Sequence, residues 1–148
     1  MFLSTSHNKI DLKCRVSIPA SFRMYLEKLN EPLILFKSLQ LPCIEGTTFT
    51  RMKRYINAID ELDALSDDAF VLRMMMADSF EIKFDANGRV VIPDILMDFA
   101  NLTNEAVFMG IGESFYIWST SEYKSQYKKS QKILNKKGPP KLILKKNE

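Results

Sequence analysis

The chain has 148 residues, of which 46% are hydrophobic and 26% are charged. This length fits one ordinary domain or two very small ones, and this composition is typical of a folded globular protein, not a disordered one. No apolar run approaches the roughly 18 residues that cross a membrane, and "MFLSTSHNK" lacks the features of a signal peptide. The two cysteines, Cys14 and Cys43, form no C-x-x-C pair, which favours a cytosolic protein with reduced thiols.

The net charge of +3 hides an uneven distribution along the chain. Residues 1–54 hold nine Lys/Arg and four Asp/Glu, a balance of +5. Residues 55–123 hold three and thirteen, a balance of −10, and residues 124–148 hold nine and one, a balance of +8. Such asymmetry favours a polyanionic partner that is met by particular surfaces of the molecule.

In chain order, the first elements lie in "SHNKIDLKCRVSIP". An alternating stretch predicts a strand, the segment from Asp11 a turn, and Val16–Ile18 a second short strand, so we expect a hairpin. Pro19 suits the first position of a helix, where no N–H is needed, and "ASFRMYLEKL" follows with Phe22 and Leu26 on one face. A further strand is predicted near residues 32–37.

The middle of the chain predicts two helices. Apolar residues recur there at spacings of three and four, at Phe49, Met52, Ile56, Ile59 and Leu62. Ser66 is a plausible N-cap for a second helix, "DDAFVLRMMMA". We interpret the Met74–Met76 run as packing rather than as a metal site.

The phrase "DLKCRVSIP" (residues 11–19) returns as "DANGRVVIP" (residues 85–93), with Asp, Arg, Val, Ile and Pro identical at the same spacing. The same element order is predicted around it: an alternating strand over 80–84, a turn, a short strand, and the helix "DILMDFANL", with Leu96 and Ala100 on one face. Strands follow over 105–119, with a turn from Gly110 to Ser114. One copy of about 45 residues seldom builds a stable core, so we expect both to share one around a pseudo-two-fold axis.

The chain ends in a Lys-rich tail. "GPP" at 138–140 breaks any helix, and we expect residues 136–148 to be poorly ordered. The lysines are expected to add salt-sensitive binding to nucleic acid without regard to its sequence.

The sequence offers little material for catalysis. His7 is the single histidine, no G-x-S-x-G is present, and two distant cysteines are poor metal ligands. Asp11 and Asp85 could meet near the axis as in aspartic proteases, and loss of peptide cleavage on either Asp→Asn change would reveal such a hydrolase. An Arg four residues after each Asp argues against it, because an ion pair lowers the carboxyl pKa.

The arginines of the repeated phrase fit a binding role better. An Arg fork matches guanine O6 and N7, and a two-stranded ribbon can enter the major groove of DNA. The candidate DNA contacts are Asn8, Lys9, Lys13 and Arg15 in the first copy and Lys83, Asn87 and Arg89 in the second. Asp11 and Asp85 are expected to orient the turns through a salt bridge to the Arg, which is also the alternative role of each Arg.

These residues carry a family resemblance over about residues 1–123. "NKID.K.RVSIPA.FR" and "D..GRV.IP......A.L......GIG..F.IW" closely resemble the MraZ family of transcriptional regulators, which has two SpoVT-AbrB-type domains. The resemblance implies an α+β fold, mainly β, in which two swapped-hairpin AbrB-like repeats form a pseudo-two-fold β-barrel with intervening and C-terminal helices. It divides the chain into repeat 1 (5–53), a helical connector (54–78), repeat 2 (79–123) and the Lys-rich C-terminal tail (124–148).

The resemblance also implies a function. It implies a sequence-specific DNA-binding repressor of the division and cell-wall gene cluster, its own promoter included, that reads short G-rich direct repeats as a ring-shaped homo-oligomer. We expect a cytoplasmic, nucleoid-associated protein without catalytic activity, cofactor, metal, membrane contact or small-molecule substrate. The family's usual Gly in the first copy is Cys14 here, which puts the conformation of that turn in question.

An alternative function stays open. The chain could be a non-catalytic assembly module whose basic first repeat binds an acidic protein partner. Preference for promoter repeats over unrelated DNA distinguishes the two hypotheses.

Overall fold

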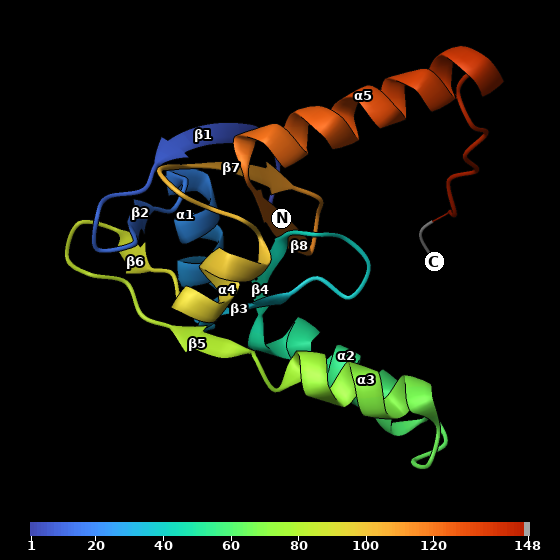
Figure 1. Ribbon diagram of the computed structural model, residues 1–148, viewed down its shortest axis with the longest axis horizontal. Coiled ribbons are helices and arrows are strands. Elements are labelled where there is room, and N and C mark those ends of the chain that lie inside the picture. Colours follow the sequence, from blue (N-terminus) through green and yellow to red (C-terminus); the bar gives the residue numbers. More distant parts are fainter. Residues whose placement is uncertain (147–148) are drawn as a thin grey trace.

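The computed structural model describes residues 1–146, and its elements repeat in the same order (Figure 1). The first half contains β1 (Thr5–Lys9), β2 (Arg15–Ser17), α1 (Ala20–Leu29), β3 (Leu33–Lys37), β4 (Ile44–Thr48) and α2 (Phe49–Asp60). Helix α3 (Asp67–Met76) connects it to the second half. That half contains β5 (Phe80–Ile82), β6 (Arg89–Val91), α4 (Asp94–Phe99), β7 (Glu105–Gly110), β8 (Ser114–Trp118) and α5 (Thr120–Lys137).

The strands form two antiparallel sheets whose order reflects the repeat. The larger sheet has the order β1-β7-β8-β4-β3-β5, and the smaller one pairs β2 with β6. If each strand is replaced by its counterpart in the other half, for example β1 by β5, both strand orders stay the same apart from direction. Val16 faces its counterpart Val90 across the small sheet. The expected α+β class is confirmed. Helices take up more of the chain than strands, so "mainly β" is wrong: the connector and the C-terminal region contribute α3 and the 18-residue α5.

The hairpin predicted around each repeated phrase does not form, whereas β7 and β8 do pair across the turn predicted from Gly110 to Ser114. β1 pairs with β7, β5 pairs with β3, and β2 pairs with β6, so these ladders join one half to the other. Within the first copy the two strands form no ladder and are linked by the isolated bridge Ile10↔Val16 and by the side chain of Asn8, which donates to the Ser17 carbonyl. A lone two-stranded hairpin is marginal in water. Pairing across the halves instead buries Val16 and Val90 in one core.

That core draws on both halves, as the repeat predicts. Phe22 and Leu26 of α1 and Leu96 of α4 are at most 2% exposed and lie in one cluster. The Phe2 ring packs edge-on against Phe22, with ring centres 5.3 Å apart. Each half supplies apolar surface that the other covers, so neither is expected to fold alone.

Helix boundaries follow the local sequence signals. Pro19 and Pro93 each directly precede the first helical residue, and the Ser66 hydroxyl accepts a hydrogen bond from the Ala69 N–H as an N-cap. Asn30 and Asn101 take φ of 51° and 54° where α1 and α4 end. Asn tolerates this left-handed conformation better than most residues, so it ends a helix without glycine.

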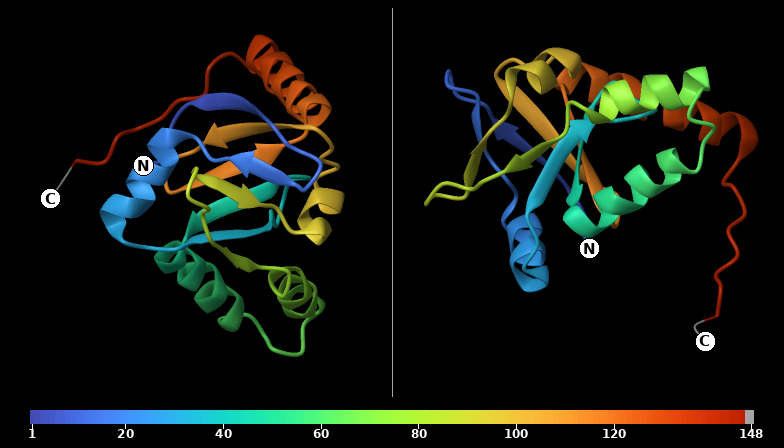
Figure 2. Two further views of the ribbon diagram at one scale, coloured as in Figure 1. Left: turned by 90° about the vertical axis from the view of Figure 1, so that its left-hand side faces the viewer. Right: turned by 90° about the horizontal axis from the view of Figure 1, so that it is seen from below.

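Helix α5 lies at one end of the molecule and the α2–α3 pair at the opposite end, with the sheets between them (Figures 1 and 2). α5 continues to Lys137 and ends at Gly138, which has φ of 70°. Lys136 and Lys137 are therefore helical, and the poorly ordered tail predicted from residue 136 is corrected there. Residues 139–146 have no regular secondary structure, and 147–148 lie outside the described residues. No helix in the described part is both long and apolar enough to cross a membrane.

Candidate nucleic-acid interface

The first turn joins β1 to β2 and is built around the carboxylate of Asp11. Its Oδ1 accepts the backbone N–H groups of Lys13 and Arg15, both at 2.9 Å. Its Oδ2 accepts Nε of Arg15 at 2.7 Å, and the Cys14 N–H donates to the Asp11 carbonyl at 3.0 Å. One carboxylate therefore fixes both the backbone of the turn and the direction of the arginine.

The second turn joins β5 to β6 and repeats each of these contacts. Asp85 Oδ1 accepts the N–H groups of Asn87 at 2.8 Å and Arg89 at 3.0 Å, and Oδ2 accepts Arg89 Nε at 3.0 Å. The Gly88 N–H donates to the Asp85 carbonyl at 3.1 Å. The expected orienting contacts of Asp11 and Asp85 are thus present in the structure.

Both carboxylates are held in the ionised form. Hydrogen bonds from the Arg15 backbone lower the pKa of Asp11 below its ordinary value, and those from Arg89 do the same for Asp85. A pair of carboxylates that shares a proton needs one raised pKa. Each aspartate is instead occupied by its own turn, and the Asp11/Asp85 hydrolase is not supported.

The two turns project from the same side of the molecule (Figures 1 and 2). The Ile92 N–H donates to the Cys14 carbonyl at 2.9 Å, and the Ile18 N–H donates to the Gly88 carbonyl at 3.3 Å. These reciprocal bonds extend the small sheet to the turns. Because backbone pairing fixes their separation, the turns can approach one ligand together.

Each arginine retains donors for a partner. The side chains of Arg15 and Arg89 are 35% and 32% exposed. Among the described residues, the side chains of both arginines hydrogen-bond through Nε, and their terminal NH₂ groups donate to no protein acceptor. A planar guanidinium held on one edge by a carboxylate is preorganised to read an acceptor pair with the other.

The other residues predicted to contact DNA differ in their exposure and in whether they already bind another residue. Lys9 and Lys13 are exposed beside the first turn, and Lys83 and Asn87 beside the second. Asn8 is half-buried, and its Nδ2 donates to the Ser17 carbonyl at 2.6 Å, which ties β1 to β2. One N–H of its side-chain amide therefore positions the turn, and the second N–H and Oδ1 are left for a ligand.

Cys14 adopts the conformation that glycine adopts in the other copy. Its φ is 60°, against 74° for Gly88, and both turns close with the same hydrogen bond. Cys14 packs at the edge of the core, with Sγ 4.0 Å from Asp94 Oδ1. A Cβ added at Gly88 would lie only 2.6 Å from the guanidinium of Arg23 on α1. The first turn thus holds a side chain in the left-handed conformation, whereas a side chain at Gly88 would also have to displace the end of Arg23.

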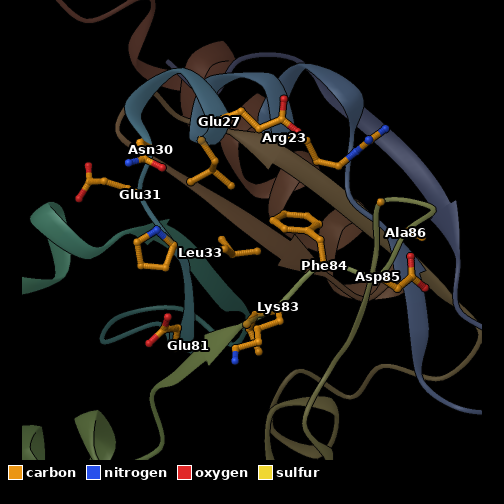
Figure 3. Close-up of a pocket in the computed structure, with 14 residues that line it drawn as sticks. Arg23, Glu27, Asn30, Glu31, Leu33, Glu81, Lys83, Phe84, Asp85 and Ala86 are labelled. Carbon is orange, nitrogen blue, oxygen red and sulfur yellow. The ribbon is translucent and has the colours of Figure 1, made fainter.

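A groove of about 570 Å³ opens beside the second turn, between α1, the start of β3 and the end of β5 (Figure 3). Phe84 points into it and is 36% exposed, whereas its counterpart in the first copy, Ile10, is 5% exposed. Ile10 extends its ladder by donating to the Asn104 carbonyl at 2.9 Å. The lining includes Arg23 and Lys83 but also the acidic residues Glu27, Glu31, Glu81 and Asp85. This acidic lining opposes close approach of a phosphate backbone to the second turn.

The sequence interpretation missed Arg23 and Phe84 at this site. Arg23 lies on α1, and its contact with the second turn forms only in the folded chain. Phe84 was expected to be an alternating residue of a strand. Aligning the copies does place aromatic Phe84 opposite aliphatic Ile10, which is the one signal that could have drawn attention to the groove. No cluster of three potential metal ligands occurs within residues 1–146.

Comparisons with known proteins agree with one another. Residues 75–144 match a family model described as "MraZ protein, putative antitoxin-like". The transcriptional regulator MraZ of Gluconobacter oxydans is 40% identical over 124 residues, which cover 80% of this chain and 76% of the relative. Those of Rickettsia akari and Rickettsia felis are 35% and 34% identical, with 90% and 93% of this chain covered, and 91% and 93% of the relatives.

Proposed function

Because this chain belongs to the MraZ family of transcriptional regulators, which are not enzymes, we propose that it is a sequence-specific DNA-binding repressor and that its first turn reads the bases. The observation that carries the proposal is that Asp11 holds Arg15 through its backbone N–H and Nε, while the terminal donors of Arg15 have no partner among residues 1–146. Such a fork matches O6 and N7 of guanine in the major groove.

The surroundings of the first turn support a DNA ligand. Lys9 and Lys13 are exposed beside the first turn and can contact phosphates. Arg89, Lys83 and Asn87 form the equivalent set on the second turn, where the acidic groove weakens attraction to DNA. We assign base reading to Arg15 and an auxiliary contact to the second turn.

The proposal extends to the fold, the DNA target, the oligomeric assembly and the location in the cell. We propose that the two sheets make a pseudo-two-fold, swapped-hairpin barrel and that repeat 1 (5–53) and repeat 2 (79–123) are its units. We propose short direct repeats in the promoter of the division and cell-wall gene cluster, including the chain's own promoter, as the target. A ring-shaped homo-oligomer suits such repeats, since several linked contacts sum to strong binding. The protein would act in the cytoplasm at the nucleoid.

The test is a binding titration of the purified protein on a fluorescent fragment of its own upstream region. Arg15→Ala is expected to weaken specific binding by the worth of one bidentate base contact, about 1–3 kcal/mol. Arg54→Ala is the matched control, because Arg54 is 64% exposed and lies on α2, away from both turns. Unchanged specific affinity of Arg15→Ala would remove the base reader from the proposal.

The same titration separates the alternative function. A module that recognises an acidic protein through the basic first turn would bind promoter repeats and unrelated DNA of equal length equally weakly. Preference for the promoter fragment that survives added competitor DNA favours the repressor.

A further inference from the structure

The C-terminal tail carries a short exposed apolar segment between lysines. This segment, Leu142–Leu144, which we call the apolar block, has three aliphatic side chains that are 84–90% exposed. None of them belongs to a core cluster of residues 1–146. Lys141 precedes the block, and Lys145 and Lys146 follow it. Large apolar side chains that are exposed together indicate a partner that covers them.

The tail leaves the fold where α5 ends. Gly138 takes φ of 70° there, and Pro139 and Pro140 follow it. Proline has no N–H for a helical hydrogen bond, and the chain continues without regular secondary structure. The tail descends from the end of α5 on the side of the molecule opposite the two turns (Figures 1 and 2). The apolar block and the arginines of the turns can therefore meet different partners.

The order of residues in the apolar block indicates what kind of surface covers it. In an extended chain successive side chains point to opposite faces, so one sheet face or groove wall covers Leu142 and Leu144, or Ile143, but not all three. The interfacial layer of a lipid bilayer surrounds a short inserted segment and accepts all three side chains. Lysine suits the same place, because its methylene stem lies along apolar groups while its ammonium stays at the headgroups.

Charge favours a lipid surface that is anionic. Residues 123–147 contain nine lysines and no acidic residue. Each lysine near an anionic bilayer strengthens binding by about fivefold. The lysines alone would suit the phosphates of DNA equally well, but a DNA backbone leaves three aliphatic side chains in water. The combination of lysines with the apolar block therefore favours lipid over nucleic acid.

We propose that residues 141–146 bind the surface of an anionic lipid bilayer, with the apolar block in the interfacial layer and the lysines at the headgroups. The expectation of no membrane contact rests on the lack of an apolar run that spans a bilayer, and a surface contact needs no such run. A single short anchor of this kind binds reversibly. Because the turns lie on the opposite side, the protein can hold DNA and a bilayer together (Figure 1). The proposal goes beyond DNA binding and does not depend on it.

Sedimentation with vesicles tests the proposal on the full chain. Wild type is expected to sediment with vesicles of equal parts phosphatidylglycerol and phosphatidylcholine, and not with phosphatidylcholine alone. The combined variant Leu142→Asn/Ile143→Asn/Leu144→Asn keeps the charge and removes the apolar block, so its binding is expected to fall at least about 10-fold. Lys145→Gln is expected to lose about fivefold. Met24→Asn is the matched control: Met24 is 67% exposed on α1, outside the tail, and its variant is expected to bind as wild type does.

A fluorescent variant tests insertion of the apolar block itself. The single tryptophan of the chain, Trp118, is 3% exposed, so it contributes a constant background. The emission of Ile143→Trp is expected to shift to the blue when the anionic vesicles are added, because the indole leaves water. An unshifted emission overturns the insertion.

The sedimentation outcomes separate the competing partners of the tail. Wild type that stays in solution with the anionic vesicles overturns the proposal, and weaker binding of Lys145→Gln to unrelated DNA then assigns the tail to nucleic acid. Equal sedimentation of the combined Asn variant and wild type also overturns it. If that variant then forms a smaller oligomer by light scattering, the block contacts another copy instead. Arg15→Ala is expected to sediment as wild type does, so a failed DNA-binding test leaves this result readable.

Discussion

The two turns share one hydrogen-bond pattern and differ in what surrounds them. Asp11 and Asp85 each hold two backbone N–H groups and one Arg Nε at nearly the same distances. The first turn is flanked by exposed lysines and holds a strained Cys14, whereas the second borders an acidic groove and holds Gly88 under Arg23. Both copies thus keep the carboxylate that orients an arginine, and the residues around each turn determine what that arginine can contact.

The largest expected effect comes from making the second turn resemble the first. Gly88→Cys places a side chain at φ of 74° and displaces the Arg23 guanidinium that lies over the glycine. We expect a loss of about 2–3 kcal/mol in the free energy of unfolding, measured by urea denaturation. Arg23→Ala in the same background is expected to restore part of it. Full stability of Gly88→Cys would mean that Arg23 does not constrain this turn.

The reverse change, Cys14→Gly, makes the first turn resemble the second. Glycine removes the cost of a left-handed residue, and the greater freedom of the unfolded chain offsets part of that gain. Loss of the partly buried Cys14 side chain also opposes it. We expect the free energy of unfolding to rise by at most about 1 kcal/mol in the same denaturation assay. A clear fall would show that core packing by Cys14 outweighs backbone strain.

The smallest expected difference between the turns is in their response to acid. The pKa of Asp11 and of Asp85 is lowered by hydrogen bonds from the turn, so folding is stabilised fully above the ordinary carboxyl pKa of 3.8. That stabilisation is lost as the pH falls through the lowered pKa of the folded state. Asp11→Asn and Asp85→Asn should each flatten the dependence of unfolding free energy on pH below 4, to the same degree. A strong effect in one turn alone would break the equivalence of the two carboxylates.

The local sequence predicted much of the fold because the relevant signals are local. The apolar spacing in α1 and α4, the prolines before them and the Ser66 cap depend on neighbours along the chain. Strand β4 was missed because "IEGTT" carries a buried Glu45 and a glycine where apolar alternation is expected. Gly46 is required by the Phe115 ring, which occupies the space of a Cβ there. That contact joins β4 to β8 and cannot be read from either segment alone.

The candidate site shows the same limit. The repeated phrase located both arginines and their aspartates, since the hydrogen bonds of each turn join residues at most four apart in the chain. The exchange of strands between halves, the Asn8 bond to Ser17 and the groove at Phe84 depend on partners far along the chain. Charge counted by segment did indicate that the first turn is the more basic one, and the acidic groove supplies the geometric reason.

The most direct test of the unequal turns compares Arg15→Ala with Arg89→Ala. The quantity to measure is the ratio of affinity for the chain's own promoter fragment to affinity for unrelated DNA, at one salt concentration. Arg15→Ala is predicted to lower this ratio by at least about 5-fold and Arg89→Ala by less than about 3-fold, since base reading is proposed for the first turn and an auxiliary contact for the second. Equal losses, or a larger loss for Arg89→Ala, would contradict the account.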